Sequence, residues 1–268
     1  MSSSGDVVHC KKRKRKQEKH YWSPLIAKYW KQRYSLFSLY DKGIAMDEVG
    51  WFSVTPESIA QIQARRVLGR CEESSNLVVI DCFAGVGGNA IQFAKTCDRV
   101  IAIEIDPVRV EHARNNARVY GVEDKIEFVV GDFFTLAPFL KGDVLFLSPP
   151  WGGPSYSKIE SFTLDLLKPK DGYSLFQVAQ SITPNIIMFL PRNVDVNEVE
   201  QLSWLSSPPL NMDIEKNYVG KFFKGITVYF GSLAKIYKAK KKKKKKKKKK
   251  EYKTLQAKIE KETEFGGE

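Results

Sequence analysis

Histidine and cysteine are scarce in this chain, and long apolar runs are absent. Its 268 residues include 3 histidines and 4 cysteines, and no two cysteines have the C-x-x-C spacing of a zinc site. No apolar run reaches the roughly 18 residues of a membrane-spanning helix, and the first residues lack the apolar stretch of a secretory signal. We therefore expect free thiols in a reducing compartment, no metal site and no membrane association.

The basic residues are concentrated in two short runs. The formal net charge is +13, yet the eleven lysines of 240–250 and the run KKRKRK at 11–16 exceed that total, so the remaining residues carry −4. This distribution excludes a broadly basic folded surface. Neither run holds apolar residues that would offset the entropy lost on folding. We expect a disordered basic tail over 1–20 and a Lys-rich, disordered or helical tail over 236–268, and we expect both to bind RNA or import factors.

The segment after the first tail is rich in aromatic residues. Their three- and four-residue spacings predict one amphipathic helix from Ser23-Pro24 to just before Gly43. A second helix is predicted to begin at Thr55-Pro56, with Thr55 as its cap, and to end near Leu68. Together they predict a helical extension over 21–70.

Short apolar runs alternate with helix-like segments from 71 to 235. The runs lie at 77–81, 100–105, 126–130, 144–147, 186–190, 212–219 and 226–230, and the helix-like segments at 88–95, 107–120, 134–140 and 172–181. This alternation predicts a seven-stranded, doubly wound α/β sheet that is mostly parallel. The last two runs, joined by a glycine-containing turn, predict a closing antiparallel hairpin.

A glycine-rich loop follows the first apolar run, in the sequence VVIDCFAGVGGNA. Asp81 lies at the carboxyl end of the run, and Gly85 is one of three glycines that lead into the next helix, where they let a ligand approach the backbone. The loop lacks Gly-Lys-Ser/Thr, which excludes a P-loop. A dinucleotide-binding enzyme is a competing interpretation, although its fingerprint needs a third glycine where Ala90 stands.

Two further acids end the second and third runs. Glu104 is placed where an acid accepts the hydroxyls of a ribose. Asp132 and Phe133 are placed where a carboxylate can accept an adenine amino group and a ring can pack on the base. The alternative for each acid is a helix cap or a surface charge. Taken with Asp81, the set resembles the Rossmann-like methyltransferases that use S-adenosylmethionine, in which Asp81 would lie near the methionine ammonium.

The fourth run ends in SPPWGGP, the most informative segment of the chain. Consecutive prolines fix the backbone, so the carbonyls of Ser148 and Pro149, held by Pro150, can accept the hydrogens of an exocyclic amine. Trp151 can clamp the base by stacking. These four residues predict the catalytic site of an amino-methyltransferase. A proline-rich turn with a buried tryptophan is the structural alternative.

The motifs together resemble a narrower family. KYWKQRYSLFSLYDKG, GWFSVTPE, DCFAGVGGN, EIDP, SPPWGGP and FLPRN occur in this order, and over about 25–232 the chain is similar to the catalytic domains of the trimethylguanosine synthases. The resemblance implies transfer of methyl groups from S-adenosylmethionine to the N2 amine of the 7-methylguanosine cap of RNA, twice. That family carries Asp where Glu104 stands, and the extra methylene is expected to weaken the ribose contact.

The resemblance also implies roles for residues outside the strand ends. Lys28 and Arg192 with its neighbour Asn193 would bind the cap, and three residues of the extension would close over the cofactor or cap, namely Phe37, Ser53 and Thr55. The expected partner is capped RNA of the snRNA or snoRNA type. We expect a monomer in the nucleus, including the nucleolus or Cajal body, with some in the cytoplasm.

Two alternatives to the cap reaction remain open. The SPPW segment fits an RNA methyltransferase acting on adenine or on another guanine, because any exocyclic amine has the same chemistry. A cap-binding module without turnover is the other alternative, against which the intact acids and SPPW segment argue.

Overall fold

The computed structural model describes residues 24–69 and 76–234. Both basic tails, with the disorder predicted for them, lie outside the described residues, as do Cys10 and Cys71. Cys82 and Cys97 are buried, and neither is in a disulfide, as expected. No helix within the described ranges is long and apolar enough to cross a membrane.

The central element is one seven-stranded sheet in the order β3-β2-β1-β4-β5-β7-β6. Its strands are β1 (Val78–Asp81), β2 (Arg99–Glu104), β3 (Ile126–Val130), β4 (Val144–Leu147), β5 (Ile186–Pro191), β6 (Met212–Val219) and β7 (Phe222–Phe230). The first five are parallel, and β7 is antiparallel to both β5 and β6. The doubly wound sheet and its closing hairpin are therefore confirmed.

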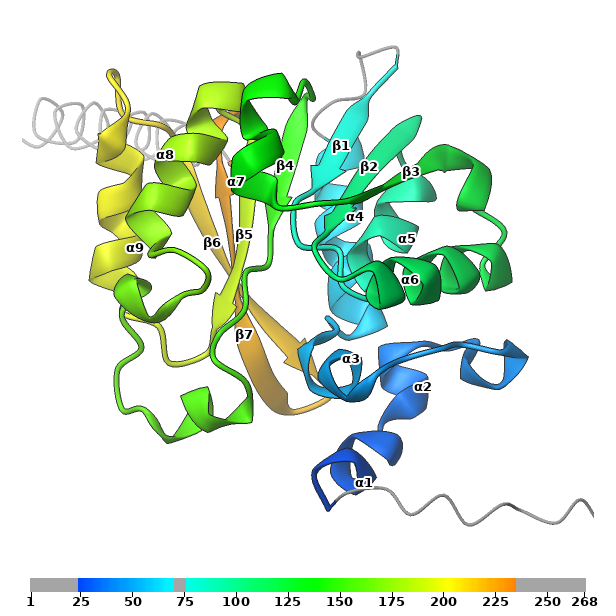
Figure 1. The fold of residues 1–268 in the computed structure, drawn as a ribbon. Helices are drawn as coiled ribbons and strands as arrows, with labels where there is room; N and C mark the ends of the chain where they lie inside the picture. Colours follow the sequence, from blue (N-terminus) through cyan, green and yellow to red (C-terminus); the bar gives the residue numbers. More distant parts are fainter. Residues whose placement is uncertain (1–23, 70–75, 235–268) are drawn as a thin grey trace, which may run out of the picture.

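Helices cover both faces of the sheet, as Figure 1 shows. One face is covered by α4 (Glu57–Leu68), α5 (Gly88–Ala94) and α6 (Pro107–Val119), and the other by α7 (Phe133–Leu136), α8 (Gly172–Ile182) and α9 (Val196–Leu202). Neighbouring strand residues face opposite clusters: Val79 and Phe146 pack in one, Ile80 and Leu145 in the other. Burial on both faces explains why the strands read as unbroken apolar runs.

The prediction of one continuous helix from Ser23-Pro24 to just before Gly43 is wrong. The chain forms α1 (Pro24–Trp30), α2 (Arg33–Leu36) and a 3₁₀ turn at Tyr40–Lys42. The breaks bring Trp30 edge-on to Tyr40, with 5.4 Å between ring centroids. In one continuous helix these two residues would be about 15 Å apart along the axis. Packing between aromatic rings therefore overrides the helical periodicity.

Two corrections concern the second half of the extension. A further helix, α3 (Glu48–Ser53), precedes the predicted one, and Asp47 caps it by accepting from the Gly50 amide at 2.8 Å. The predicted cap of α4 is also wrong: Pro56 occupies the N-cap position, and Thr55 is buried without capping the helix. Thr55 is instead part of the layer that packs on the sheet domain.

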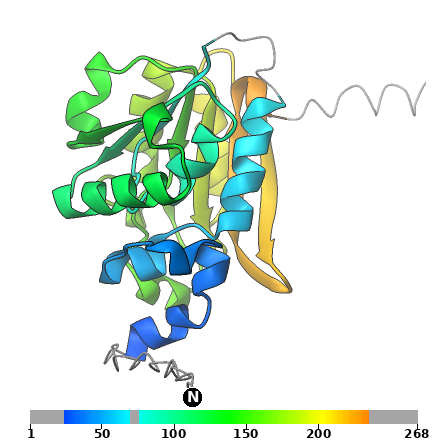
Figure 2. The ribbon, with the colours of Figure 1, turned by 90° about the vertical axis from the view of Figure 1, so that its right-hand side faces the viewer.

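The extension lies at the end of the sheet where the parallel strands terminate. In Figures 1 and 2 the blue helices α1–α3 lie below the carboxyl ends of β1 and β2. Phe37 and Trp51 are buried in the same hydrophobic cluster as Val86 of the glycine-rich loop. The extension therefore shares a core with the sheet and is held against the predicted site.

Candidate active site

Four strands deliver the predicted acids and the SPPW segment to one edge. Asp81 ends β1, Glu104 ends β2, Asp132 follows β3 and Ser148 follows β4. The chain order of the strands reverses between β1 and β4, and ligands of open α/β sheets bind at such a switch point. The structure therefore brings the two halves of the predicted site together.

Asp81 is the most unusual group at this edge. Its side chain is 1% exposed, and neither carboxylate oxygen has a hydrogen-bond partner among the described residues. Burial, reinforced by the charge of Glu104, raises the pKa of Asp81 to about 7, although the nearby amides of Phe83 and Ala90 oppose the shift. A buried carboxylate is costly to ionise without a cation beside it, and Asp81 forms no ion pair with a described residue. The site therefore fits a ligand that carries a cation, such as the ammonium of S-adenosylmethionine.

The glycine-rich loop is shaped by contacts that exclude side chains. Gly85 and Gly87 have φ of +53° and +87°, in the left-handed region that favours glycine. A Cβ on Gly88 would lie 2.6 Å from Cγ2 of Val54, because the extension passes directly over the loop. At Gly85 nothing lies within 4 Å of such a Cβ, so the loop backbone is open to a ligand there.

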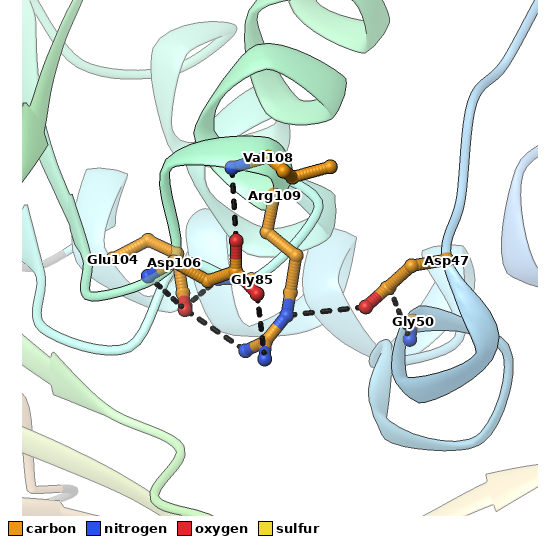
Figure 3. A network of polar contacts seen from close by, with 7 residues as sticks. All are labelled: Asp47, Gly50, Gly85, Glu104, Asp106, Val108 and Arg109. Carbon is orange, nitrogen blue, oxygen red and sulfur yellow. Dashed lines mark hydrogen bonds and ion pairs between the residues drawn. The ribbon is translucent and has the colours of Figure 1, made fainter.

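Glu104 is held in place by three hydrogen bonds, drawn in Figure 3. Its Oε2 accepts from the Gly85 amide at 2.9 Å, and its Oε1 accepts from the Asp106 amide at 3.1 Å and from Nη1 of Arg109 at 2.9 Å. The predicted ribose acid is therefore linked directly to the glycine-rich loop.

Asp132 acts as a helix cap. Its carboxylate accepts from the amides of Phe134 and Thr135 at 3.4 and 3.3 Å and from the Thr135 hydroxyl at 3.0 Å. The cap alternative thus applies to this acid, and a contact with adenine would use the acceptor sites that remain.

The ring of Phe133 does not lie where packing on a base requires. It is 2% exposed and packs against Phe83, with 5.9 Å between ring centroids. No open ring face remains, so this prediction needs correction: Phe133 is the first residue of α7, and its side chain is buried in the core between the sheet and the helices α7–α9. Ile105, directly after β2, and Val130, at the end of β3, have exposed apolar side chains at this edge.

Trp151 is half-buried on the other side of the switch point. Its ring meets Tyr156 edge-on, with 5.1 Å between centroids, and Phe189 at 5.2 Å. Its indole Nε1 is buried without a partner, and no hydrogen bond among the described residues uses the carbonyls of Ser148 or Pro149. This corner therefore has the free acceptors that an amine needs.

Asn193 holds the loop that follows Trp151. Its Nδ2 donates to the carbonyls of Tyr156 at 3.2 Å and Ile159 at 2.7 Å, while its buried Oδ1 has no partner. The structure thus gives the predicted cap residue a loop-positioning contact.

Lys224 of β7 lies near two other cations, Lys28 and Arg192, and Arg192 also lies near Tyr156. Lys28 and Arg192 are the two predicted ones, and Lys224 of β7 is a third that no sequence motif marked. Burial lowers the pKa of Lys224, and repulsion from Lys28 and Arg192 adds to the effect. None of the three forms an ion pair with a described residue. Unpaired cations at close range favour a polyanionic ligand.

The extension supplies the remaining predicted residues. Phe37 is buried, with its Cζ 3.9 Å from the position of a Cβ on Gly88, and the Thr55 carbonyl is 3.7 Å from the same point. Ser53 is exposed at the end of α3. Phe37 and Thr55 are therefore placed over the glycine-rich loop.

Comparison with known proteins agrees with this arrangement. The RNA cap guanine-N2 methyltransferase family matches residues 76–233. The chain is 39% identical over 219 residues to the trimethylguanosine synthase of Schizosaccharomyces pombe, covering 78% of this chain and 89% of that protein. It is 37% identical to the trimethylguanosine synthase of Saccharomyces cerevisiae, covering 66% of this chain and 58% of that protein.

A solved structure supports the fold. A methyltransferase-like protein from Porphyromonas gingivalis has a TM-score of 0.60 and 15% identity, covering 76% of this chain and 48% of that one. At this identity the likeness concerns the fold alone. Sequence match, sheet order and site geometry agree, and the chain belongs to the RNA cap guanine-N2 methyltransferase family.

Proposed function

We propose that this protein transfers methyl groups from S-adenosylmethionine to the N2 amine of the 7-methylguanosine cap of RNA, twice, to give the 2,2,7-trimethylguanosine cap. The observation that carries the proposal is a group of cations that form no ion pair with a described residue, Lys28, Arg192 and Lys224. Arg192 connects this group to the SPPW segment, because it lies near Tyr156, whose ring contacts Trp151. A lone nucleobase would need no such group, whereas a cap brings a triphosphate with it.

The cofactor half of the site is assigned from charge and hydrogen-bonding capacity. S-adenosylmethionine, when bound, supplies a methyl group on a sulfonium centre. Asp81 would accept hydrogen bonds from the ammonium of its methionine part, because neither oxygen of this buried carboxylate has a hydrogen-bond partner among the described residues. Glu104 would accept a ribose hydroxyl at Oε2. Phe37 and Thr55 would cover the glycine-rich loop and exclude water.

The target half is assigned from the free acceptors of the SPPW segment. Trp151 would stack on the guanine, and the carbonyls of Ser148 and Pro149 would accept the two hydrogens of the N2 amine. Held in this way, the amine nitrogen would receive the methyl group from the sulfonium sulfur, and one proton would leave the nitrogen to water. This reaction requires no general base, because the N2 nitrogen is positively charged and strongly acidic once it has been methylated.

The positive charge of 7-methylguanine adds to the stacking. A cation on a tryptophan face gains up to about 2 kcal/mol when desolvated, which corresponds to roughly 30-fold in affinity. Lys28, Arg192 and Lys224 would then bind the triphosphate. These assignments account for a preference for methylated caps.

Localisation and assembly belong to the same proposal. We propose that the protein is a monomer and that it is found in the nucleus, including the nucleolus or Cajal body, with some in the cytoplasm. Its basic runs at 11–16 and 240–250 would bind RNA or import factors. The composition of these runs supports it.

The reaction is tested on a small cap. The protein is incubated with 7-methylguanosine diphosphate and S-adenosylmethionine, and product masses are read for one and two added methyl groups. Both products are expected. Methylation of uncapped RNA instead would favour the general RNA methyltransferase. Binding of cap and cofactor with no product would favour the inactive cap-binding module.

A further inference from the structure

Arg109, in the first turn of α6, contacts three carboxylates from two distant parts of the chain. Its Nε donates to Asp47 at 3.2 Å, its Nη1 to Glu104 at 2.9 Å, and its Nη2 pairs with Asp106 at 3.2 Å (Figure 3). Glu104 ends β2 and Asp106 caps α6, whereas Asp47 belongs to the extension. One guanidinium therefore joins the ribose acid to a segment 57 residues earlier, as the numbering gives.

The contact with Asp47 reaches the part of the extension that covers the site. Asp47 uses its Oδ1 to cap α3 and its Oδ2 to accept from Arg109. The other end of α3 carries Ser53, which lies just before the residues over the glycine-rich loop. The position of α3 is therefore tied to the carboxylate of Glu104 through Arg109.

The hydrogen bonds of Glu104 leave little capacity unused. A carboxylate has about four acceptor sites, two on each oxygen. Oε1 accepts from the Asp106 amide and from Arg109, and Oε2 accepts from the Gly85 amide alone. One site remains, on the oxygen that faces the glycine-rich loop.

We propose that Arg109 is a positioning residue for the cofactor ribose. By occupying Oε1 it turns Oε2 toward one ribose hydroxyl, and by holding Asp47 it brings α3 to the same place. The inference rests on the proposed function only in taking an S-adenosyl compound as the ligand. A planar guanidinium directs donors at three carboxylates at once, which a lysine ammonium does less well. Glu104 has one more rotatable bond than aspartate, so its orientation depends more on such a partner.

The test measures ribose recognition by calorimetry, without any cap. Affinities for S-adenosylhomocysteine and its 2′-deoxy analogue are compared in wild type, Arg109→Met and Arg109→Lys. The matched control is Arg118→Met, which removes an exposed pair with Glu123 from the same helix. We expect the wild type to prefer the ribose form about tenfold, as one charge-assisted hydrogen bond gives. Arg109→Met should reduce this preference to within about twofold, and Arg109→Lys should restore part of it.

A second variant tests the link to the extension. Asp47→Asn keeps a side-chain oxygen for the cap of α3 but removes the anion that faces Arg109. We expect about threefold weaker binding of S-adenosylhomocysteine, and no further loss when it is combined with Arg109→Met, because the two residues act through one contact.

Several outcomes overturn the inference. These are a wild type that does not distinguish the two ligands, equal weakening of both by Arg109→Met, or additive effects of the two variants. If the titrations come out as expected while the wild type makes no product on 7-methylguanosine diphosphate, the proposed function alone is wrong. If product forms but the preference for the ribose ligand over its 2′-deoxy analogue is the same in Arg109→Met as in the wild type, only this inference is wrong.

Discussion

The two halves of the site differ in how their polar groups are satisfied. On the cofactor side, Glu104 is held by Gly85, Asp106 and Arg109, and Asp81 is the one acid left without partners among the described residues. On the target side, the Trp151 indole lacks a partner and nearby cations repel one another. The cofactor side is thus largely preorganised, whereas the target side is completed by its ligand.

Removing the Trp151 side chain should impair methyl transfer to the cap without impairing cofactor binding. We expect Trp151→Ala to lower transfer to 7-methylguanosine diphosphate by at least about 100-fold, because the clamp on the base is lost. Cofactor affinity should stay within about threefold. Product masses and calorimetry measure the two effects. Collapse of cofactor affinity would show that the halves are not separate.

Neutralising Asp81 should have the opposite effect and impair binding of the cofactor. Asp81→Asn should weaken S-adenosylmethionine binding by about 30-fold or more, the loss of a charge-assisted contact in a buried site. Without ligand, the Asp81→Asn variant should have a higher free energy of unfolding than the wild type at pH 8. Its wild-type carboxyl has a pKa of about 7 in place of 3.8, so the folded state binds more protons than the unfolded state and stability falls as pH rises between these values. Unchanged affinity and an unchanged or lower Tm would contradict the assignment.

The same carboxyl predicts a pH dependence of cofactor binding. The ammonium of the ligand favours ionised Asp81, so affinity should rise about tenfold from pH 6 to pH 8, as the ionised fraction does for a pKa near 7. Binding at pH 7 should release about half a proton, because a carboxyl with a pKa near 7 is half protonated there, and the release is visible as a difference in apparent enthalpy between two buffers. Asp81→Asn is the comparison, and its residual affinity for the cofactor should lack this step.

A substitution of Lys224 tests whether this lysine contributes to cap binding on the target side of the site. Lys224→Met should raise KM for a capped dinucleotide about five- to tenfold, the size expected for one partly screened phosphate contact. Cofactor affinity should not change. Lys221→Met, in the same hairpin but beside Phe222, is the control. A similar effect of both variants would point to general surface charge.

Deleting 240–250 should have the smallest effect. The rate on a cap dinucleotide should stay the same, because the groups assigned to the reaction lie elsewhere in the chain. Affinity for long RNA and its dependence on salt should fall. An equal loss on both substrates would place the tract in the site.

The parts of the molecule that sequence could predict are those with local signals. Strand runs buried on both faces and the helices Gly88–Ala94 and Pro107–Val119 followed from periodicity, and the acids followed from their place at strand ends. The interrupted extension did not, because the contact of Trp30 with Tyr40 depends on tertiary packing. Lys224 and the Asp47–Arg109 pair were missed for the same reason: their partners lie far away in the sequence.

The close approach of Val54 to Gly88 has a consequence for how much chain the enzyme needs. The family match begins at residue 76, after Val54, Phe37 and Trp51, which are packed on the domain that follows. A protein cut at that boundary would keep every strand but uncover the glycine-rich loop and an apolar surface beside it. The segment that matches the family is therefore shorter than the segment that packs together around the glycine-rich loop.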